Sequence, residues 1–335
     1  MRNVVKTALA IAISVLTIFA IFKVTNVQIA LLDIRRLDIR YIIVALLLQI
    51  SFWFLWALRL KLITNALGKM ISYSYSFKVT LSSMFFAAIT PSSAGGEPVR
   101  VKLIGDVCKS YGTSSAVVLI ERLLDAIFFA IALPIFLIVT DFAVGFGFRV
   151  AGLFSIFLML FILTIYLLFE DPERLERFIV DFNQKILRIF LKGRIEKITE
   201  KMINEAKSFR MALIEVVRAR KVFTFAITFI TVAMWLLGFL IPSFILLAMK
   251  CDPSYLLSIT SQLIIVVVSL IPLTPGSSGI AEGSMAYLYS NFVPQSVLGI
   301  LVAIWRFITY YTNLFLGFVF SLSVSRRTYA VGSID

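Results

Sequence analysis

The sequence contains no histidine, two cysteines and few charged residues. Without histidine, the usual ligand sets of a zinc site and histidine-based acid–base pairs are excluded. Cys108 and Cys251 lie far apart, each alone, so no disulfide framework can be built from them. Charged residues make up 15% of the 335 residues and hydrophobic residues 60%. Because a soluble globular domain carries about 25% charged residues, this composition indicates an integral membrane protein.

Uncharged runs of spanning length recur along the chain. About 20 consecutive apolar residues match the thickness of the hydrocarbon core of a bilayer. We predict an all-α polytopic membrane protein with about six transmembrane helices, at residues 7–22, 41–58, 113–140, 150–169, 222–248 and 295–322. The first run is interpreted as a retained helix, since no small-residue cleavage site follows it.

The distribution of basic residues predicts the orientation. The formal net charge is +13, and the basic residues are dispersed among loops between the spans. Membrane lipids, in particular anionic headgroups, are therefore expected as partners, and nucleic acid is not. Residues 170–221 carry many charges of both signs and apolar residues at helical spacing on both sides of Gly193, which predicts an amphipathic helical hairpin against the membrane surface. Because basic loops stay cytoplasmic, we expect this hairpin and both termini in the cytoplasm of a multi-pass protein of the cell membrane.

The same rule predicts two re-entrant hairpins of opposite orientation. Basic residues expected in the cytoplasm lie at and beyond both ends of the stretch 76–105, so this stretch should enter the membrane and return. These residues are Arg59, Lys61, Lys69, Lys78, Arg100, Lys102 and Lys109. The stretch from Asp252 to Pro294 should likewise leave and return on the outer side.

The two predicted hairpins share a motif. "TPSSAGGEPV" begins at residue 90 and "TPGSSGIAEG" at residue 274, and an arginine follows the first threonine by 32 residues in both copies. The matching positions are Thr90 with Thr274, Ser93 with Ser277, Gly95 with Gly279 and Arg122 with Arg306. We predict an inverted repeat, at about 41–140 and 222–325, within a single domain of residues 1–335. Such repeats with broken helices are typical of secondary transporters.

The interrupted helices predict an anion site. A helix that restarts within the membrane presents free N–H groups and a positive dipole end, and an arginine near the bilayer centre is costly and therefore usually functional. Arg122 and Arg306 are expected to bind a phosphate group, because the guanidinium fork suits phosphate oxygens. The other candidate substrate-binding residues are Glu97, Glu282, Arg100, Asp125, Thr90, Ser92, Ser93, Gly95, Gly96, Thr274, Ser277, Ser278 and Gly279.

Each candidate also has a structural interpretation. Arg122 can pair with Glu121 or Asp125, and Arg306 with Glu282. Glu97 and Glu282 are proton-coupling carboxylates, helix caps or salt-bridge partners, and the spacing of Glu97 and Arg100 favours a salt bridge. The hydroxyl residues either bind a ligand or satisfy backbone groups freed by proline. The aromatic cluster Trp53, Phe54 and Trp56 is interpreted as interfacial or lipid-facing packing.

Three stretches, "TPSSAGGEPVRVKLI", "ERLLDAIFF" and "PLTPGSSGIAEG", resemble signatures of the lysylphosphatidylglycerol synthase transmembrane-region family of flippase-like membrane proteins. The resemblance covers nearly the whole chain and implies movement of a charged lipid or lipid-linked headgroup between leaflets. In bacterial relatives an aminoacyl-transferase domain is fused to this region, and ten residues follow Ser325 here, so synthase activity is not expected. The motif also resembles archaeal members, for which a polyprenyl-phosphate-linked sugar is a candidate lipid.

We therefore expect a lipid translocase, not an enzyme, that uses no cofactor or metal and takes a phospholipid or polyprenyl-phosphate-linked substrate. No GxxxxGK[ST] motif for nucleotide is present. The alternative is a membrane glycosyl- or phospho-transferase acting on a lipid carrier, with Glu97, Asp125 and Glu282 as its carboxylates. A third reading, a structural subunit, requires that the buried charges neutralise one another. A homodimer is compatible with the sequence.

Overall fold

The computed structural model describes residues 37–90, 94–142, 144–170, 177, 180, 195–271 and 274–331. Among these residues, five helical segments are long and apolar enough to cross a membrane. They are α3 (Ile39–Ala66), α6 (Tyr111–Thr140), α7 (Val144–Glu170), α11 (Lys221–Ala248) and a continuous segment made of α14 (Gln295–Arg306), the π-helix η2 (Phe307–Tyr311) and α15 (Thr312–Val331). Five of the six predicted spans are thus helices at the expected places, and the first, at 7–22, lies outside the described residues.

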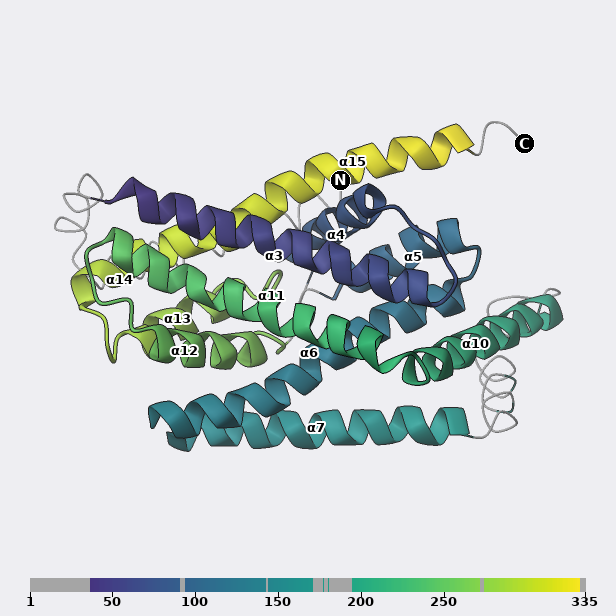
Figure 1. Cartoon of the computed structure of the whole chain (residues 1–335), viewed down its shortest axis with the longest axis horizontal. Helices are drawn as coiled ribbons and strands as arrows, with labels where there is room; N and C mark the ends of the chain where they lie inside the picture. The colour runs from purple at the N-terminus through teal and green to yellow at the C-terminus, as the bar shows by residue number, and fades with distance from the viewer. Residues whose placement is uncertain are drawn as a thin grey trace.

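The spans α3 and α11 pack side by side and antiparallel (Figure 1). The side chain of Asp38 caps α3 by accepting a hydrogen bond from the backbone N–H of Arg40. The backbone N–H of Asp38 donates to the carbonyl of Ala248, at 2.9 Å, which joins the start of α3 to the end of α11. In Figure 1, α7 lies at the edge of the molecule, and large apolar side chains of its outer surface, such as Leu153 and Phe157, are exposed as a lipid-facing span requires.

Two helix–turn–helix hairpins lie between the spans. The first consists of α4 (Tyr73–Ala88) and α5 (Gly96–Cys108), and the second of α12 (Tyr255–Val268) and α13 (Ile280–Tyr289). The helices contain 16, 13, 14 and 10 residues. At 1.5 Å per residue each is shorter than the hydrocarbon core of about 30 Å. The turns between them carry the two matching motifs, whose prolines and glycines interrupt the helix.

The two hairpins have equivalent partners. We call residues 39–140 the first half and residues 221–331 the second half, and each contains a span, a hairpin and a final span in that order. The first helix of each hairpin packs on the final span of the opposite half, α4 on α15 and α12 on α6. The contact with α15 is close, because a Cβ at Gly317 would lie 2.6 Å from the carbonyl oxygen of Leu81.

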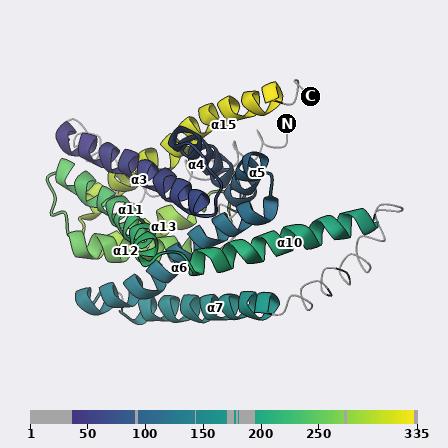
Figure 2. The same cartoon turned by 45° about the vertical axis from the view of Figure 1, so that its right-hand side comes forward.

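The predicted amphipathic hairpin is described in its second helix, α10 (Ile195–Val217), while Gly193 and most of the first helix lie outside the described residues. Figure 2 shows α10 extending beside α6 toward the end of the molecule. Glu205 accepts hydrogen bonds from the backbone N–H of Gly112, at 2.5 Å, and from Ser110 Oγ, at 3.1 Å. Apolar residues of α10, including Ala212, join a cluster with α3, α5 and α6. This face of α10 is therefore covered by protein.

Candidate functional site

The tips of the two hairpins meet. The backbone N–H of Gly276 donates to the carbonyl of Thr90, at 2.9 Å, and Tyr310 Oη donates to the carbonyl of Ala88, at 3.1 Å. Gly276 has a φ of +56°, and a Cβ there would lie 2.6 Å from the carbonyl oxygen of Ala88. Only glycine fits this conformation and this approach without strain. We call these interactions the tip contact.

A cavity of about 340 Å³ lies beside the tip contact and is lined by residues of both halves. Its size falls within the usual range of ligand pockets, about 300–1,000 Å³. The charged residues in its lining are Glu97, Arg100, Arg122 and Arg306, and the aromatic ones are Phe52, Trp56, Trp235, Trp305 and Tyr310. Ser83, Ser269, Ser277, Thr309 and Asn313 add polar groups.

Two arginines of the first half face the cavity. Arg100 is buried and donates to Glu121 Oε2 and to Ser83 Oγ, each at 3.0 Å. Arg122 has 35% of its side chain exposed and lies 3.5 Å from Glu97 and 3.4 Å from Asp125. The ring of Trp56 contacts both cations, with its centroid 4.8 Å from Arg100 Cζ and 5.2 Å from Arg122 Cζ.

Three donors in this part of the lining lack a hydrogen-bond partner, one of them Arg122 Nε. Trp56 Nε1 and Arg100 Nε are buried and bond to no other group of the described residues. An unsatisfied buried donor costs about 1–3 kcal/mol. A ligand with acceptor oxygens would remove that cost.

A third arginine of the first half lies behind the lining. Arg59 is fully buried and donates to Asp125 Oδ1, at 2.6 Å, and to Glu121 Oε1, at 3.4 Å. Asp125 also accepts from Trp235 Nε1, at 2.8 Å. Arg59 therefore holds both carboxylates that position the cavity arginines Arg100 and Arg122.

In the second half, Arg306 and Glu282 form a buried pair. The distances are 2.8 Å from Nε to Oε1 and 2.9 Å from Nη2 to Oε2. Glu282 Oε2 also accepts from the backbone N–H of Gly279, at 2.8 Å, so the carboxylate caps α13 as well as pairing. The π-helix η2 starts directly after Arg306 and places Thr309 and Tyr310 in the cavity lining. Such π segments are frequent at functional sites.

The charges of the site balance in number but not in position. Arg59, Arg100, Arg122 and Arg306 meet Glu97, Glu121, Asp125 and Glu282. Three arginines and one glutamate line the cavity, whereas the other three carboxylates and Arg59 lie outside the lining. A structural subunit requires that the buried charges neutralise one another, and the four arginines and four carboxylates do so in number. The cavity lining, however, carries three arginines and one carboxylate, so a ligand there would meet an excess of positive charge.

Comparison with known proteins finds a family model and several archaeal relatives. A family model described as "Lysylphosphatidylglycerol synthase TM region" matches residues 7–317. The chain belongs to this family. A "UPF0104 membrane protein" of Archaeoglobus fulgidus is 48% identical over 309 residues, which cover 92% of this chain and 94% of the relative. A protein of the same name from Methanothermobacter thermautotrophicus is 26% identical over 83% of both chains. No solved structure matches significantly.

Within this family member, three of the four motif hydroxyls in the described residues bond to the hairpin backbone. Thr90 Oγ1 donates to the carbonyl of Phe86, at 2.8 Å, and accepts from the N–H of Gly95, at 2.8 Å. Thr274 Oγ1 donates to the carbonyl of Ser278, at 2.7 Å, and Ser277 Oγ to that of Ser269, at 2.6 Å. Gly96 allows α5 to approach α4, since a Cβ would lie 2.9 Å from the carbonyl of Ser83. Ser92 and Ser93 lie outside the described residues.

Several sequence interpretations are wrong. The expected salt bridge of Glu97 with Arg100 is absent from the described residues, since Glu97 pairs with Arg122. Arg59 and Arg100 were counted among the basic residues outside the membrane interior, but both are buried in the ion-pair network, and Arg100 lines the cavity as a predicted binding residue. Trp56 lines the cavity, and Trp53 is buried and donates to Asn313 Oδ1, at 2.8 Å, so neither is lipid-facing packing. Because Arg59 stands close to Lys61 and Lys69 in the sequence, it was counted with them as a charge after the end of the span. In the structure α3 continues to Ala66, so Arg59 lies inside the helix.

Proposed function

We propose that this protein moves a lipid with an anionic headgroup between the two leaflets of the membrane. The headgroup enters the cavity while the lipid tails remain in the bilayer. The observation that carries the proposal is a cavity shared by both hairpins and lined by Arg100, Arg122 and Arg306 with one carboxylate, Glu97.

The donor set suits a phosphate group. Guanidinium groups bind phosphate oxygens in pairs, and Trp56 Nε1 and Arg100 Nε supply two further donors without a partner. The carboxylates hold the arginines in place when no lipid is bound. A phosphate can displace these carboxylates most easily at Arg122, because the ion pairs of Arg122 with Glu97 and Asp125 are long, at 3.5 and 3.4 Å.

The hairpins support an alternating-access mechanism. Their helices are shorter than a span, and the turns carrying the motifs meet at the tip contact. This geometry fits two re-entrant hairpins that enter from opposite sides as an inverted repeat. Lys61, Lys69 and Lys102 lie near the same ends of the spans as α10, which fits a cytoplasmic location of that end.

The excess of cations in the lining favours an anionic headgroup over an aminoacylated one. The ammonium groups of a lysyl headgroup would face three arginines with only Glu97 to neutralise them. Phospholipids with a single phosphate, or a polyprenyl-phosphate-linked sugar, carry the charge that this lining complements.

The test is leaflet transfer in proteoliposomes. Fluorescent phosphatidylglycerol, lysylphosphatidylglycerol and a polyprenyl-phosphate-linked sugar are followed as their headgroups become inaccessible to a membrane-impermeant quencher. Arg122→Gln and Arg306→Gln are each expected to slow transfer of the anionic lipids about 10- to 100-fold, because each removes a charge-assisted contact of about 1.5–3 kcal/mol.

Lys102→Gln is the matched control, because Lys102 is exposed and outside the cavity lining. It is expected to leave the rate unchanged within about twofold, the usual limit for a surface change. Unchanged transfer in both arginine variants, with the wild type active, would refute phosphate binding by this cavity. A covalently altered lipid in the extract, without transfer, would instead point to a transferase that uses Glu97 in the lining or Asp125 and Glu282 behind it.

A further inference from the structure

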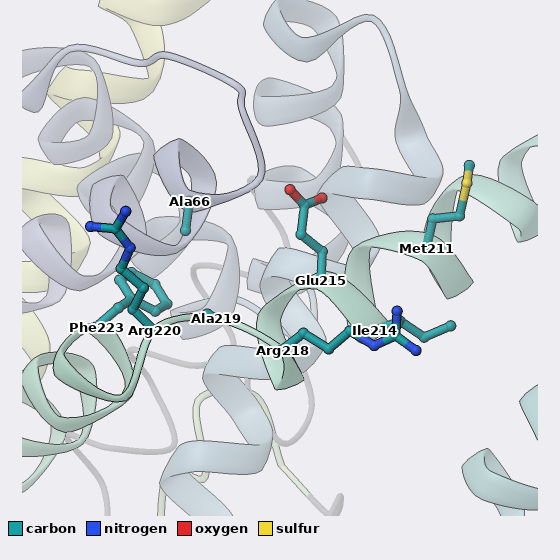
Figure 3. A pocket seen from close by; sticks show the side chains of 8 residues that line it. All are labelled: Ala66, Met211, Ile214, Glu215, Arg218, Ala219, Arg220 and Phe223. Atoms are coloured by element: carbon teal, nitrogen blue, oxygen red, sulfur yellow. The ribbon is translucent and has the colours of Figure 1, made fainter.

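A second hollow lies away from the central cavity, where α10 reaches the ends of two spans. It has a volume of about 630 Å³ and is lined by Ala66, Met211, Ile214, Glu215, Arg218, Ala219, Arg220 and Phe223 (Figure 3). We call it the α10 groove. Ala66 is the last residue of the span α3, and Lys221 is the first residue of the span α11. The α10 groove therefore lies where the apolar parts of these spans end, at the boundary between hydrocarbon and headgroups.

The walls of the α10 groove are apolar. Met211, Ile214, Glu215 and Arg218 lie at i, i+3, i+4 and i+7 along α10, so they form one stripe that faces the groove. The adjacent stripe, with Ala212 and Val216, is packed against protein. Met211 is 60% exposed, and Phe223 contributes an aromatic wall from α11. Figure 3 shows these two side chains on different helices, on opposite sides of the labelled residues.

The rim of the α10 groove is basic. Arg218 and Arg220 are exposed and come from the end of α10 and the connection to α11, and Figure 3 shows their guanidinium groups on different sides of the groove. Lys221 follows directly and is exposed as well. Glu215 is the single carboxylate in the lining, so the lining has a cationic excess of one.

We propose that the α10 groove binds an anionic phospholipid, separate from the lipid that the central cavity transfers. The phosphate binds at the basic rim that Arg218 and Arg220 form, and the upper part of one tail covers Met211, Ile214 and Phe223. Charge complementarity and the position at the end of two spans favour this occupant, since basic pockets between helices at the membrane surface bind acidic headgroups. The lipid would join α10 to α3 and α11, the three elements that form the groove.

The experiment uses the purified full-length protein in detergent and native mass spectrometry with added phosphatidylglycerol or phosphatidylcholine. A photoreactive phosphatidylglycerol locates the bound lipid by the peptide it labels. The wild type is expected to retain phosphatidylglycerol in preference to phosphatidylcholine, and the photoreactive lipid is expected to label the peptide that contains residues 211–223. The double variant Arg218→Gln, Arg220→Gln is expected to bind it about 30-fold more weakly, since each basic residue near a membrane surface contributes about 1 kcal/mol.

The matched control is Lys201→Gln, Lys207→Gln, which removes two charges from exposed positions of the same helix outside the groove. It is expected to retain the lipid and the label. An equal loss in this control would show attraction by net charge alone and overturn the proposal, as would equal retention of phosphatidylcholine. In Arg122→Gln the photoreactive lipid is still expected to label residues 211–223, even if lipid transfer between leaflets is lost. Loss of lipid binding in the α10 groove and loss of transfer through the central cavity can therefore be told apart.

Discussion

Replacement of Arg59 by methionine is expected to lower the free energy of unfolding by about 3–5 kcal/mol, the usual cost of leaving a buried charge without its partner. Arg59 is fully buried between Glu121 and Asp125, at 3.4 and 2.6 Å. Methionine preserves much of the volume but leaves these carboxylates without their shared cation. Titration of the purified protein with sodium dodecyl sulfate in mixed micelles measures the change.

Two further variants separate the ion pair from other effects of the substitution. Lys61→Met, on the same helix and only partly buried, removes the same charge and should change stability by less than about 0.5 kcal/mol. Arg59→Met combined with Asp125→Asn should be more stable than Arg59→Met alone, because asparagine removes one uncompensated charge and can still accept from Trp235. A single variant as stable as the wild type would contradict the assignment of Arg59 as the central cation.

The second large effect is expected at the tip contact. Gly276→Ala should reduce headgroup transfer about tenfold or more and destabilise the protein by about 2 kcal/mol. The left-handed conformation at φ +56° costs a residue with a Cβ about 1–2 kcal/mol. The new methyl group would also lie 2.6 Å from the carbonyl oxygen of Ala88, so the two tips must separate. The transfer assay and the micelle titration together measure both effects.

Gly283→Ala is the matched control on the same hairpin. A Cβ at Gly283 meets nothing within 4 Å, and the residue lies inside α13. Alanine is favoured over glycine in a helix by about 1 kcal/mol, so this variant should be slightly more stable and transfer lipid at the wild-type rate. Equal loss in both variants would show that the hairpin tolerates no change of any kind and that the tip contact has no special role.

The spans could be predicted from the sequence because apolar length alone decides whether a helix can cross a membrane. Five of the predicted runs coincide with described helices, from α3 to the segment ending in α15. The matching motifs likewise located both hairpin turns, since proline and glycine interrupt a helix wherever it lies. The pair of Arg306 with Glu282 was foreseen as one of two interpretations.

The partners of the first-half arginines could not be predicted, because they depend on which helices lie side by side. Arg59 and Glu121 are 62 residues apart in the chain, and Arg100 and Glu121 are 21 apart. A rule that counts basic residues near the ends of apolar runs assigns Arg59 and Arg100 to loops, as it does Lys61 and Lys102. The π-helix after Arg306 has no signature in the sequence either, because its residues Phe307–Tyr311 are ordinary for an apolar span.

The packing of each hairpin on a span of the opposite half also predicts how a fragment that contains one half would behave. The first helix of each hairpin rests on the final span of the opposite half, α4 on α15 and α12 on α6. Neither half therefore contains every neighbour of its own hairpin, although α4 also packs on α3 and α12 on α11 within the same half. A polypeptide consisting of one half would keep the contacts within that half but would lack the final span of the other half on which its hairpin also packs, so the two halves interlock as the subunits of an intertwined dimer do.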